Sequence, residues 1–252
     1  MLTNREIQRY SRQIAFIGEE SQERLKAAHV VLAGAGGLGC PAALYLAVAG
    51  LGRLTIIDAD QVEMTNLNRQ ILHREEDIGR NKTVSARDKL EAINPDVIIK
   101  DVCEVITRQN AQALTRQATL VIDALDNFPA RYALNLAALA HGIPCIHGAV
   151  SGYDGHLTTI IPGETACLQC IFPDPPCGSE FPIIGTTAGI IGLMQAHEAI
   201  KFLTGSGTLL KNRLLIWDGR DSSVTFLDLE PDPECRACGT CTQNTGSVKG
   251  GS

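Results

Sequence analysis

Short apolar runs alternate with helical patterns between His29 and Val150. The apolar runs are HVVLAG (29–34), RLTIID (53–58), VIIKDV (97–102), TLVIDAL (119–125) and IPCIHGAV (143–150). The helical patterns between them fall near 38–49, 80–93, 107–117 and 129–141. Strands that alternate with helices in this order pair in parallel and are covered by helices on both faces. The pattern therefore predicts an α/β fold with a mostly parallel sheet.

The two ends of the chain carry different patterns. Residues 2–28 predict N-terminal helices with a break near Gly18. Beyond Ser151, the runs GHLTTIIP, NRLLIWD and VTFLDLE have turn signals between them. They predict an antiparallel C-terminal extension of the sheet, and a helix is expected over 187–203.

Two segments are expected to lack regular structure. Residues 162–185 contain many prolines and glycines, which predicts a mobile crossing loop. The polar residues 242–252 predict a disordered tail. The remaining length, 1–241, fits one domain because α/β folds often reach this size undivided.

Composition and charge exclude several classes of partner. The net charge of −6 is spread along the chain, so no basic patch for nucleic acid or anionic lipid is evident. No apolar stretch approaches the roughly 20 residues of a membrane span, and the N-terminus is too polar for a signal peptide. We therefore expect a cytoplasmic protein, in which the nine cysteines are thiols or metal ligands rather than disulfides.

A glycine loop follows the first predicted strand. Gly34, Gly36 and Gly39 match G-x-G-x-x-G before a predicted helix, and Asp58 ends the next strand. Glycines let the backbone approach phosphate oxygens, the helix offers unpaired N–H groups, and the carboxylate can bind ribose hydroxyls. This context predicts a Rossmann-like nucleotide site, which suits NAD as well as ATP.

The side chains that follow Asp58 favour ATP. They form a polar and basic cluster: Asn66, Asn68, Arg69, Gln70 and Lys82. A nicotinamide dinucleotide carries roughly two phosphate charges and a nucleoside triphosphate roughly four, so the triphosphate needs more cations. Asp126, after the fourth strand, would lie at the carboxyl edge of the sheet and could hold Mg²⁺.

Five motifs in order carry a resemblance to a known family. RYSRQI, GAGGLGC, DADQVEMTNLNRQ, GRNKTVSARDKL and DALDN resemble the E1-like adenylyltransferases of the ThiF, MoeB and HesA group. The resemblance spans about Arg9 to Cys238, and within the group it is to bacterial members that serve molybdopterin and thiamine synthesis. It implies an enzyme that binds MgATP and adenylates the C-terminal glycine of a ubiquitin-like sulfur carrier protein, which releases pyrophosphate.

The resemblance also implies roles for individual residues. The nucleotide would be held by Gly34, Gly36, Gly37, Gly39, Asp58, Asp60, Asn66, Leu67, Asn68, Arg69, Lys82, Asp126 and Asn127. Arg69 and Lys82 would act on the phosphates and Asp126 would hold the metal ion. In the family, the arginine matching Arg12 reaches into the partner subunit's active site, which implies a homodimer. Other implied partners are a carrier protein ending in Gly-Gly and a sulfurtransferase or cysteine desulfurase.

The cysteine spacing predicts a zinc site. Cys167 and Cys170 form one C-x-x-C unit, and Cys235 and Cys238 form another. Two such units can present four thiolates to one zinc ion and tie the crossing loop to the C-terminus, and many relatives carry a structural zinc there. A redox dithiol or idle thiols are the alternatives. Cys241 forms a further C-x-x-C unit with Cys238, so the second pair has two possible registers.

Cys177 is a candidate for a different role. It lies in the predicted loop ahead of a helix, where the helix dipole favours a thiolate. Some relatives use a cysteine in this region to receive sulfur as a persulfide, although here the stretch is one residue longer than expected. Cys40, Cys103 and Cys145 lie among apolar residues and are expected to pack in the core.

Three functions follow from these residues. The first is a carrier-protein adenylyltransferase, the second a nicotinamide-dependent oxidoreductase, and the third a noncatalytic nucleotide-binding scaffold. Binding of NAD without ATP would favour the second, and binding of ATP without pyrophosphate exchange the third.

Overall fold

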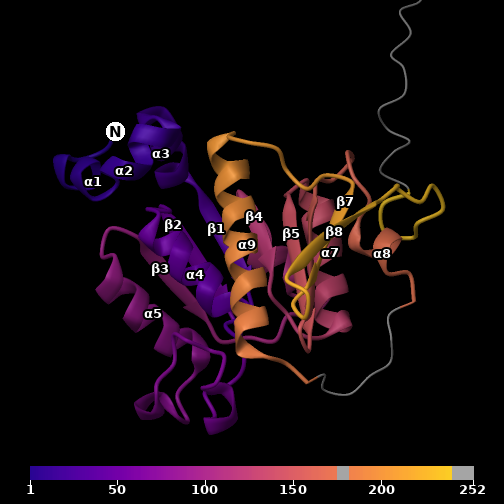
Figure 1. Cartoon of the computed structure of the whole chain (residues 1–252), viewed down its shortest axis with the longest axis horizontal. Coiled ribbons are helices and arrows are strands. Elements are labelled where there is room, and N and C mark those ends of the chain that lie inside the picture. Colours follow the sequence, from indigo (N-terminus) through magenta and orange to yellow (C-terminus); the bar gives the residue numbers. More distant parts are fainter. Residues whose placement is uncertain (175–181, 240–252) are drawn as a thin grey trace, which may run out of the picture.

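The computed structural model describes residues 1–174 and 182–239 and contains one eight-stranded sheet with the order β3-β2-β1-β4-β5-β6-β7-β8 (Figure 1). The strands are β1 (His29–Ala33), β2 (Arg53–Ile57), β3 (Ile98–Val102), β4 (Leu120–Asp123), β5 (Cys145–Ser151), β6 (Asp154–Ile160), β7 (Arg213–Asp218) and β8 (Ser223–Asp228). β1 to β5 pair in parallel, and β5 to β8 pair antiparallel. The α/β architecture with an antiparallel extension is confirmed.

Successive side chains of a strand point to opposite sides, so these apolar strands give the sheet two apolar faces. Helices cover both faces. Val30 and Leu32 of β1 belong to one apolar cluster, and Val31 and Ala33 to the other. The first cluster is covered by α3 (Glu19–Ala27), α4 (Gly39–Val48), α5 (Lys82–Ile93) and α9 (Gly185–Thr204). The second is covered by α6 (Ala111–Thr115), α7 (Phe128–His141) and α8 (Leu168–Ile171).

The N-terminal segment has one more break than the sequence predicts. Gly18, with a φ of +82°, ends one helix as expected, but Tyr10 separates α1 (Asn4–Arg9) from α2 (Ser11–Ile17). The Tyr10 side chain is buried, and its hydroxyl accepts a hydrogen bond from Asn94 Nδ2 at 2.9 Å. This long-range contact bends the chain at a position where local propensity gives no signal.

Three short helices also lie where the sequence predicts none. Two 3₁₀ helices, η1 (Met64–Asn66) and η2 (Glu75–Asp77), follow β2. α8 falls within the predicted crossing loop, so 162–185 is not loop throughout. Residues 175–181 of that loop and the predicted tail 242–252 lie outside the described residues.

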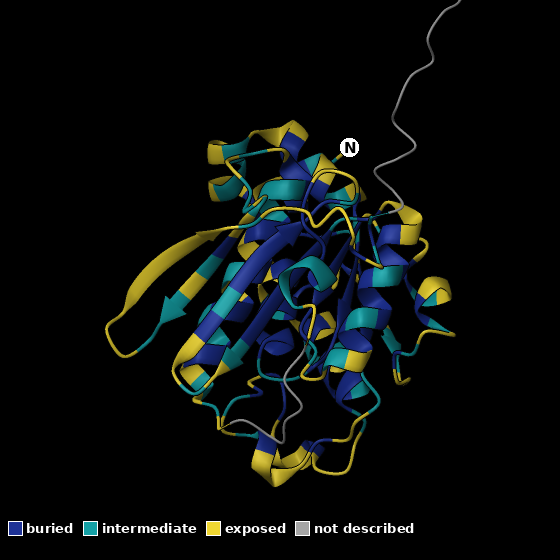
Figure 2. Ribbon diagram, turned by 90° about the vertical axis from the view of Figure 1, so that its right-hand side faces the viewer, coloured by how far each residue is buried: buried dark blue, intermediate teal, exposed yellow. Residues whose placement is uncertain are grey.

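The sheet is buried at its centre and exposed at one edge. Every residue of β8 is exposed, whereas all four residues of β4 are buried (Figure 2). Within the described ranges, no helix is both long and apolar enough to cross a membrane.

Helix α9 approaches neighbouring backbone closely at two glycines. A Cβ atom at Gly192 would lie 2.3 Å from the carbonyl oxygen of Leu38, and one at Gly185 would lie 2.4 Å from that of Asn68. Both contacts are too short for any side chain. They fix α9 against the start of α4 and against the turn after β2.

Two substitutions on α9 test this packing. Gly192→Ala is expected to lower the free energy of unfolding by roughly 1–3 kcal/mol, because the methyl group forces α9 away from α4. Gly189→Ala is the matched control, since no atom lies within 4 Å of its Cβ position, and alanine should there raise stability by roughly 0.5–1 kcal/mol. Urea denaturation measures both, and equal effects would contradict the close approach.

Candidate functional site

The glycine loop joins β1 to α4 through contacts between backbone atoms. Gly34 has a φ of +102°, and a Cβ atom there would lie 2.5 Å from the carbonyl oxygen of Ala124. A Cβ atom at Gly39 would lie 2.0 Å from the carbonyl oxygen of Gly34. Gly36 is different, because the nearest atom to its Cβ position is Gln70 Nε2, at 3.7 Å. The loop is therefore closely packed at both ends and more open at Gly36.

The peptide groups around Ala35 are held from two sides. Asp58 Oδ2 accepts the Ala35 N–H at 2.8 Å, and Oδ1 accepts the Asp60 N–H at 2.9 Å. His73 Nε2 contacts the Ala35 carbonyl oxygen at 3.1 Å, so this nitrogen carries the proton. Burial raises the pKa of Asp58 and lowers that of His73. Asp58 thus supports the loop, with lone pairs left for a ligand.

Lys82 provides a buried cation beside the loop. Its side chain is 8% exposed and donates to Asp60 Oδ2 at 2.8 Å, whereas that of Asp60 is 67% exposed. A backbone hydrogen bond from the Lys82 N–H to the Asp60 carbonyl oxygen fixes the same pair at 2.9 Å. A buried ammonium group with one exposed carboxylate partner is suited to exchange that partner for phosphate oxygens.

Helix η1 and the turn after it position Arg69. Asn66 is buried, and its Oδ1 accepts the Glu63 N–H at 3.1 Å. Arg69 Nη1 donates to the Thr65 carbonyl oxygen at 2.8 Å and to Asn68 Oδ1 at 3.0 Å. Leu67, between them in the chain, is partly buried.

The turn lies against the glycine loop. A Cβ atom at Gly37 would lie 3.5 Å from Arg69 Cγ. Gln70 is buried with its Oε1 unpartnered among the described residues. The sequence placed Gln70 in the polar cluster but gave it no role, and its position beside Gly36 adds it to the candidate site.

Asp126 and Asn127 lie in the turn between β4 and α7. Asn127 Oδ1 accepts the Ala130 N–H at 3.0 Å and so caps α7, and its Nδ2 donates to Asp126 Oδ1 at 3.2 Å. The Asp126 side chain is exposed at the carboxyl edge of the sheet. The peptide of Ala124 joins this turn to β1, since its N–H donates to the Ala33 carbonyl oxygen at 2.9 Å.

A buried polar network behind this turn was missed from the sequence. Asp123 Oδ2 accepts a 2.7 Å hydrogen bond from His147 Nδ1, and His147 Nε2 lies 3.2 Å from His156 Nε2. The strand register brings Asp123 opposite His147. Burial lowers the pKa of His147, and burial lowers that of His156 to about 3. The signal that could have revealed this network is a polar residue inside each apolar run, Asp123 in one and His147 in the other.

Arg12 does not lie near the glycine loop of its own chain. It is exposed on α2, and its neighbour Gln13 donates to the carbonyl oxygen of Ala49, the C-cap of α4, at 2.9 Å. The glycine loop adjoins the other end of α4, and a helix of ten residues is about 15 Å long. The N-terminal helices and the start of α9 accordingly lie at opposite ends of the molecule (Figure 1).

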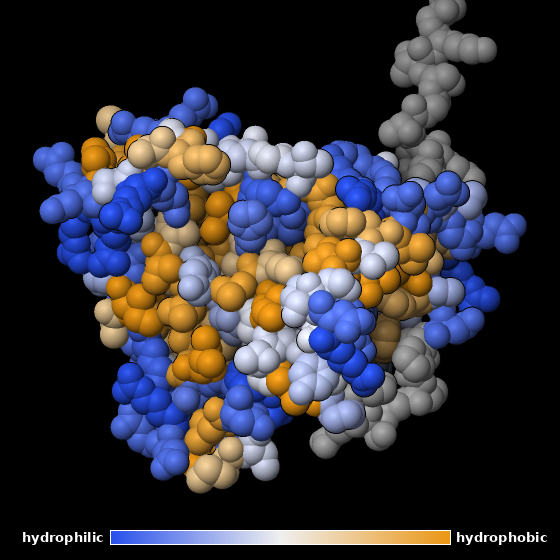
Figure 3. All heavy atoms as spheres, in the orientation of Figure 1, coloured by the Kyte–Doolittle hydropathy of each residue, from blue (hydrophilic) through white to orange (hydrophobic). Residues whose placement is uncertain are grey.

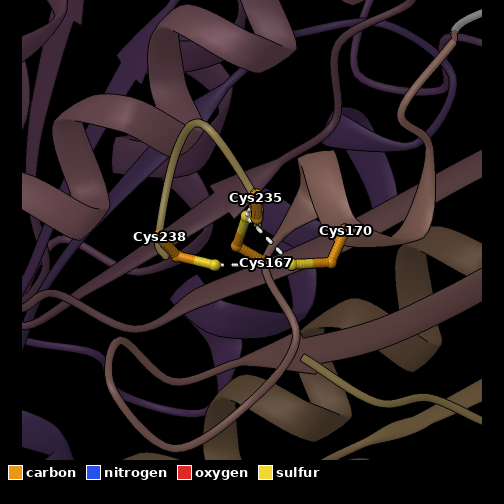
Figure 4. A group of neighbouring side chains, drawn as sticks. All are labelled: Cys167, Cys170, Cys235 and Cys238. Carbon is orange, nitrogen blue, oxygen red and sulfur yellow. Dashed lines mark hydrogen bonds between the residues drawn. The ribbon is translucent and has the colours of Figure 1, made fainter. Parts of the chain in front are cut away.

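Four cysteine side chains converge on the second face of the sheet (Figure 4). Their sulfur atoms all lie within 4.8 Å of one another in the cluster Cys167, Cys170, Cys235 and Cys238. Three of the separations are 3.7, 3.8 and 3.4 Å. Zinc–sulfur bonds of about 2.3 Å in a tetrahedron place sulfur atoms about 3.8 Å apart, so this donor set fits a divalent metal such as zinc.

The other cysteines have different environments. Cys40 and Cys145 are buried, as expected. Cys103 is exposed, so its assignment to the core was wrong, because it follows β3 at the edge of the sheet. Cys177 and Cys241 lie outside the described residues.

Comparison with known proteins gives close relatives over most of the chain. The sequence pattern of the ThiF family matches residues 10–237. The "SAMP-activating enzyme E1" of Haloferax volcanii is 38% identical over 242 residues, which cover 93% of this chain and 89% of that protein. The "Sulfur carrier protein adenylyltransferase" of Thermus thermophilus is 39% identical over 250 residues, covering 94% and 92%.

Two further comparisons concern longer proteins. The "Adenylyltransferase and sulfurtransferase MOCS3" of Culex quinquefasciatus is 42% identical over 247 residues, and this chain spans 56% of its length. The crystal structure of E. coli MccB with ATP superposes with a TM-score of 0.83 at 23% identity, covering 92% of this chain and 74% of that one. The superposition on MccB shows that the two proteins share a fold.

The buried histidines make stability depend on pH. The pKa of His156 falls from 6.5 to about 3 on folding, so between these values the unfolded chain binds a proton that the folded chain does not. Stability is then complete above about pH 6.5 and decreases as the pH falls. Between pH 7.5 and 5.0, the free energy of unfolding of the wild type should decrease. In His156→Gln this decrease is expected to be smaller by about 2 kcal/mol.

Urea denaturation at the two pH values measures this difference. His197→Gln is the control, because that ring is exposed on α9. A pH dependence that is the same in wild type and His156→Gln would contradict the shifted pKa.

Proposed function

The chain belongs to the ThiF family, and we propose that it adenylates the C-terminal glycine of a small ubiquitin-like sulfur carrier protein. ATP is the second substrate and pyrophosphate is released. The names of the Haloferax and Thermus relatives support this activity, as both align along nearly their whole length. The structural observation that carries the proposal is that two cations adjoin the glycine loop. Arg69 lies beside Gly37, and Lys82 is linked to Ala35 through Asp60 and Asp58.

The proposed reaction needs positioning and charge compensation. A carboxylate oxygen of the carrier's terminal glycine forms a bond to the α-phosphorus, and the bond from this phosphorus to the bridging oxygen breaks as pyrophosphate leaves. Lys82 and Arg69 reduce the repulsion between the two anions and stabilise the charge that develops on the leaving group. The backbone at Gly36, where the nearest atom to the Cβ position is 3.7 Å away, is the proposed approach for the phosphates. No covalent bond to the enzyme is required.

Asp126 is the proposed ligand of Mg²⁺. Its carboxylate is exposed, and its hydrogen bond to Asn127 involves Oδ1 alone among the described contacts. Oxygen donors of this kind are those that Mg²⁺ prefers, and the ion would reduce the charge of the triphosphate. We assign Asp58, Asp60, Asn66, Leu67, Asn68 and Asn127 to the surrounding nucleotide site.

The four-cysteine cluster is the proposed zinc site, with Cys235 rather than Cys241 as the partner of Cys238. Burial raises the pKa of Cys167 to about 11, so four adjacent thiolates require a cation to be stable. The Asp232 N–H donates to Cys170 Sγ at 3.4 Å, a contact that supports a thiolate. Zinc would hold the chain beyond β8 against α8.

A homodimer belongs to the proposal because Arg12 is distant from its own glycine loop. α2 has no buried residue, and the Phe16 side chain on it is 89% exposed. Tyr45 and Val48 of α4 are also exposed, and apolar side chains gather on this face of the molecule (Figure 3). These residues form a candidate surface through which Arg12 reaches a second copy. The sulfurtransferase named in the Culex relative supports a sulfur donor as a further partner.

Isotope exchange between ATP and pyrophosphate tests the proposed activity. Candidate carriers with a Gly-Gly terminus, encoded beside the gene, are each added to the purified chain. We expect one of them to stimulate exchange. Asp126→Asn should lower the exchange rate roughly 10²-fold or more, because a metal ligand is lost.

Asp221→Asn, an exposed carboxylate in the β7–β8 turn, is the control and should retain the wild-type rate. NAD binding without ATP binding would instead identify an oxidoreductase. ATP binding with no exchange for any carrier, unchanged by Asp126→Asn, would favour a scaffold.

Metal analysis tests the cysteine cluster. The purified wild type should contain about one zinc ion per chain, since four thiolates bind one ion, and Cys167→Ser should lose it and denature at a lower temperature. Cys241→Ser should keep the metal. Loss of zinc in Cys241→Ser but not in Cys235→Ser would assign the other register.

A further inference from the structure

Both peptide groups of Leu125, immediately before Asp126, are held by buried side chains. The Leu125 N–H donates to Asp123 Oδ1 at 3.1 Å. Its carbonyl oxygen accepts two hydrogen bonds from Arg131, from Nε at 3.2 Å and Nη2 at 2.5 Å. This carbonyl belongs to the peptide that links Leu125 to Asp126, so Arg131 fixes the plane from which the Asp126 side chain projects.

Arg131 is itself held in place. It is 7% exposed on the first turns of α7, and its guanidinium carbon lies 5.4 Å from the centre of the Phe128 ring. Nε lies 3.9 Å from Asp123 Oδ1, and Asp123 is in turn held by His147. Arg131 and Asp123 are both buried, and both are hydrogen-bonded to Leu125. The turn that contains Leu125 therefore has little conformational freedom.

The chemistry of arginine suits this position. Its planar group presents two parallel N–H donors to one carbonyl oxygen, whereas lysine has a single flexible ammonium group. The two bonds restrict rotation of the Leu125–Asp126 peptide more than one bond can. The exposed Asp126 side chain thus starts from a rigid backbone, although its own carboxylate is free to bind.

We propose that Arg131 is a positioning residue, which, with Asp123, orients the Asp126 turn and thereby sets the contribution of Mg²⁺ to ATP binding. This inference rests on the proposed role of Asp126. It assigns to Arg131 no contact with the nucleotide. The effect should therefore be confined to the metal-dependent part of ATP affinity.

Calorimetric titration of the full chain with ATP, in the presence of Mg²⁺ and separately in EDTA, tests the proposal. In the wild type, Mg²⁺ should raise the affinity for ATP. Arg131→Met should reduce the affinity for MgATP roughly tenfold, the cost of losing hydrogen bonds from a charged group, and change the affinity in EDTA less than about threefold. Arg131→Lys, which keeps the charge but replaces the planar pair of donors by one ammonium group, should lie between Arg131→Met and the wild type.

Asn135→Ala is the matched control on the same helix. Asn135 is buried one turn further along α7, and its Oδ1 accepts the Leu168 N–H at 3.1 Å, far from the Asp126 turn. It should lower the melting temperature but leave the ratio of the two affinities unchanged. The proposal would be overturned if Arg131→Met lost ATP affinity equally with Mg²⁺ and in EDTA. It would also be overturned if the ratio of these two affinities in both Arg131 variants equalled that of the wild type.

The same measurements separate this inference from the proposed function. If Asp126→Asn keeps the full effect of Mg²⁺, the metal role of Asp126 is wrong and the inference falls with it. If Asp126→Asn loses the effect and Arg131→Met keeps it, Asp126 remains the ligand and only the positioning role is wrong.

Discussion

Backbone packed directly against backbone at the carboxyl ends of β1 and β4 is the constraint on which the rest of the candidate site depends. Gly34 lies against the carbonyl group of Ala124, and Gly39 against that of Gly34. With no side chain between them, the start of α4 and the Asp126 turn are held to one geometry. Any larger residue at either glycine would separate the loop from the turn, and the groups proposed to bind the phosphates would move apart.

Buried polar side chains bind the backbone on each side of this contact and fix the position of the peptide groups there. Asp58 and His73 hold Ala35 on the β2 side, and Asp123 and Arg131 hold Leu125 on the β4 side. A buried charge is costly unless it is paired and hydrogen-bonded. These side chains meet that condition by bonding to loop backbone, so they fix the peptides of both loops. The exposed Asp60 and Asp126 remain available to a ligand.

Much of the fold could be predicted because its signals are local. Each apolar run became a strand, since a short apolar segment between helices can bury both faces only inside a sheet. The break at Tyr10 and the network around Asp123 could not be predicted in this way. Both depend on partners far along the chain, Asn94 for Tyr10 and His147 for Asp123. The pairing of Asp123 with His147 can be predicted only when the register between β4 and β5 is known.

Helix α7 connects the two candidate sites, which the sequence treated separately. Its N-terminus is capped by Asn127 beside Asp126, and its next turns reach the segment that carries the first cysteine pair. Asn135 accepts the Leu168 N–H, and the Tyr132 hydroxyl donates to the Phe172 carbonyl oxygen. A metal ion at the cysteines would therefore stabilise the later turns of a helix whose first turn lies beside Asp126. The two candidate sites therefore share one structural element, although Tyr132 and Asn135 contact the cysteine segment from its later turns and Asp126 precedes its first turn.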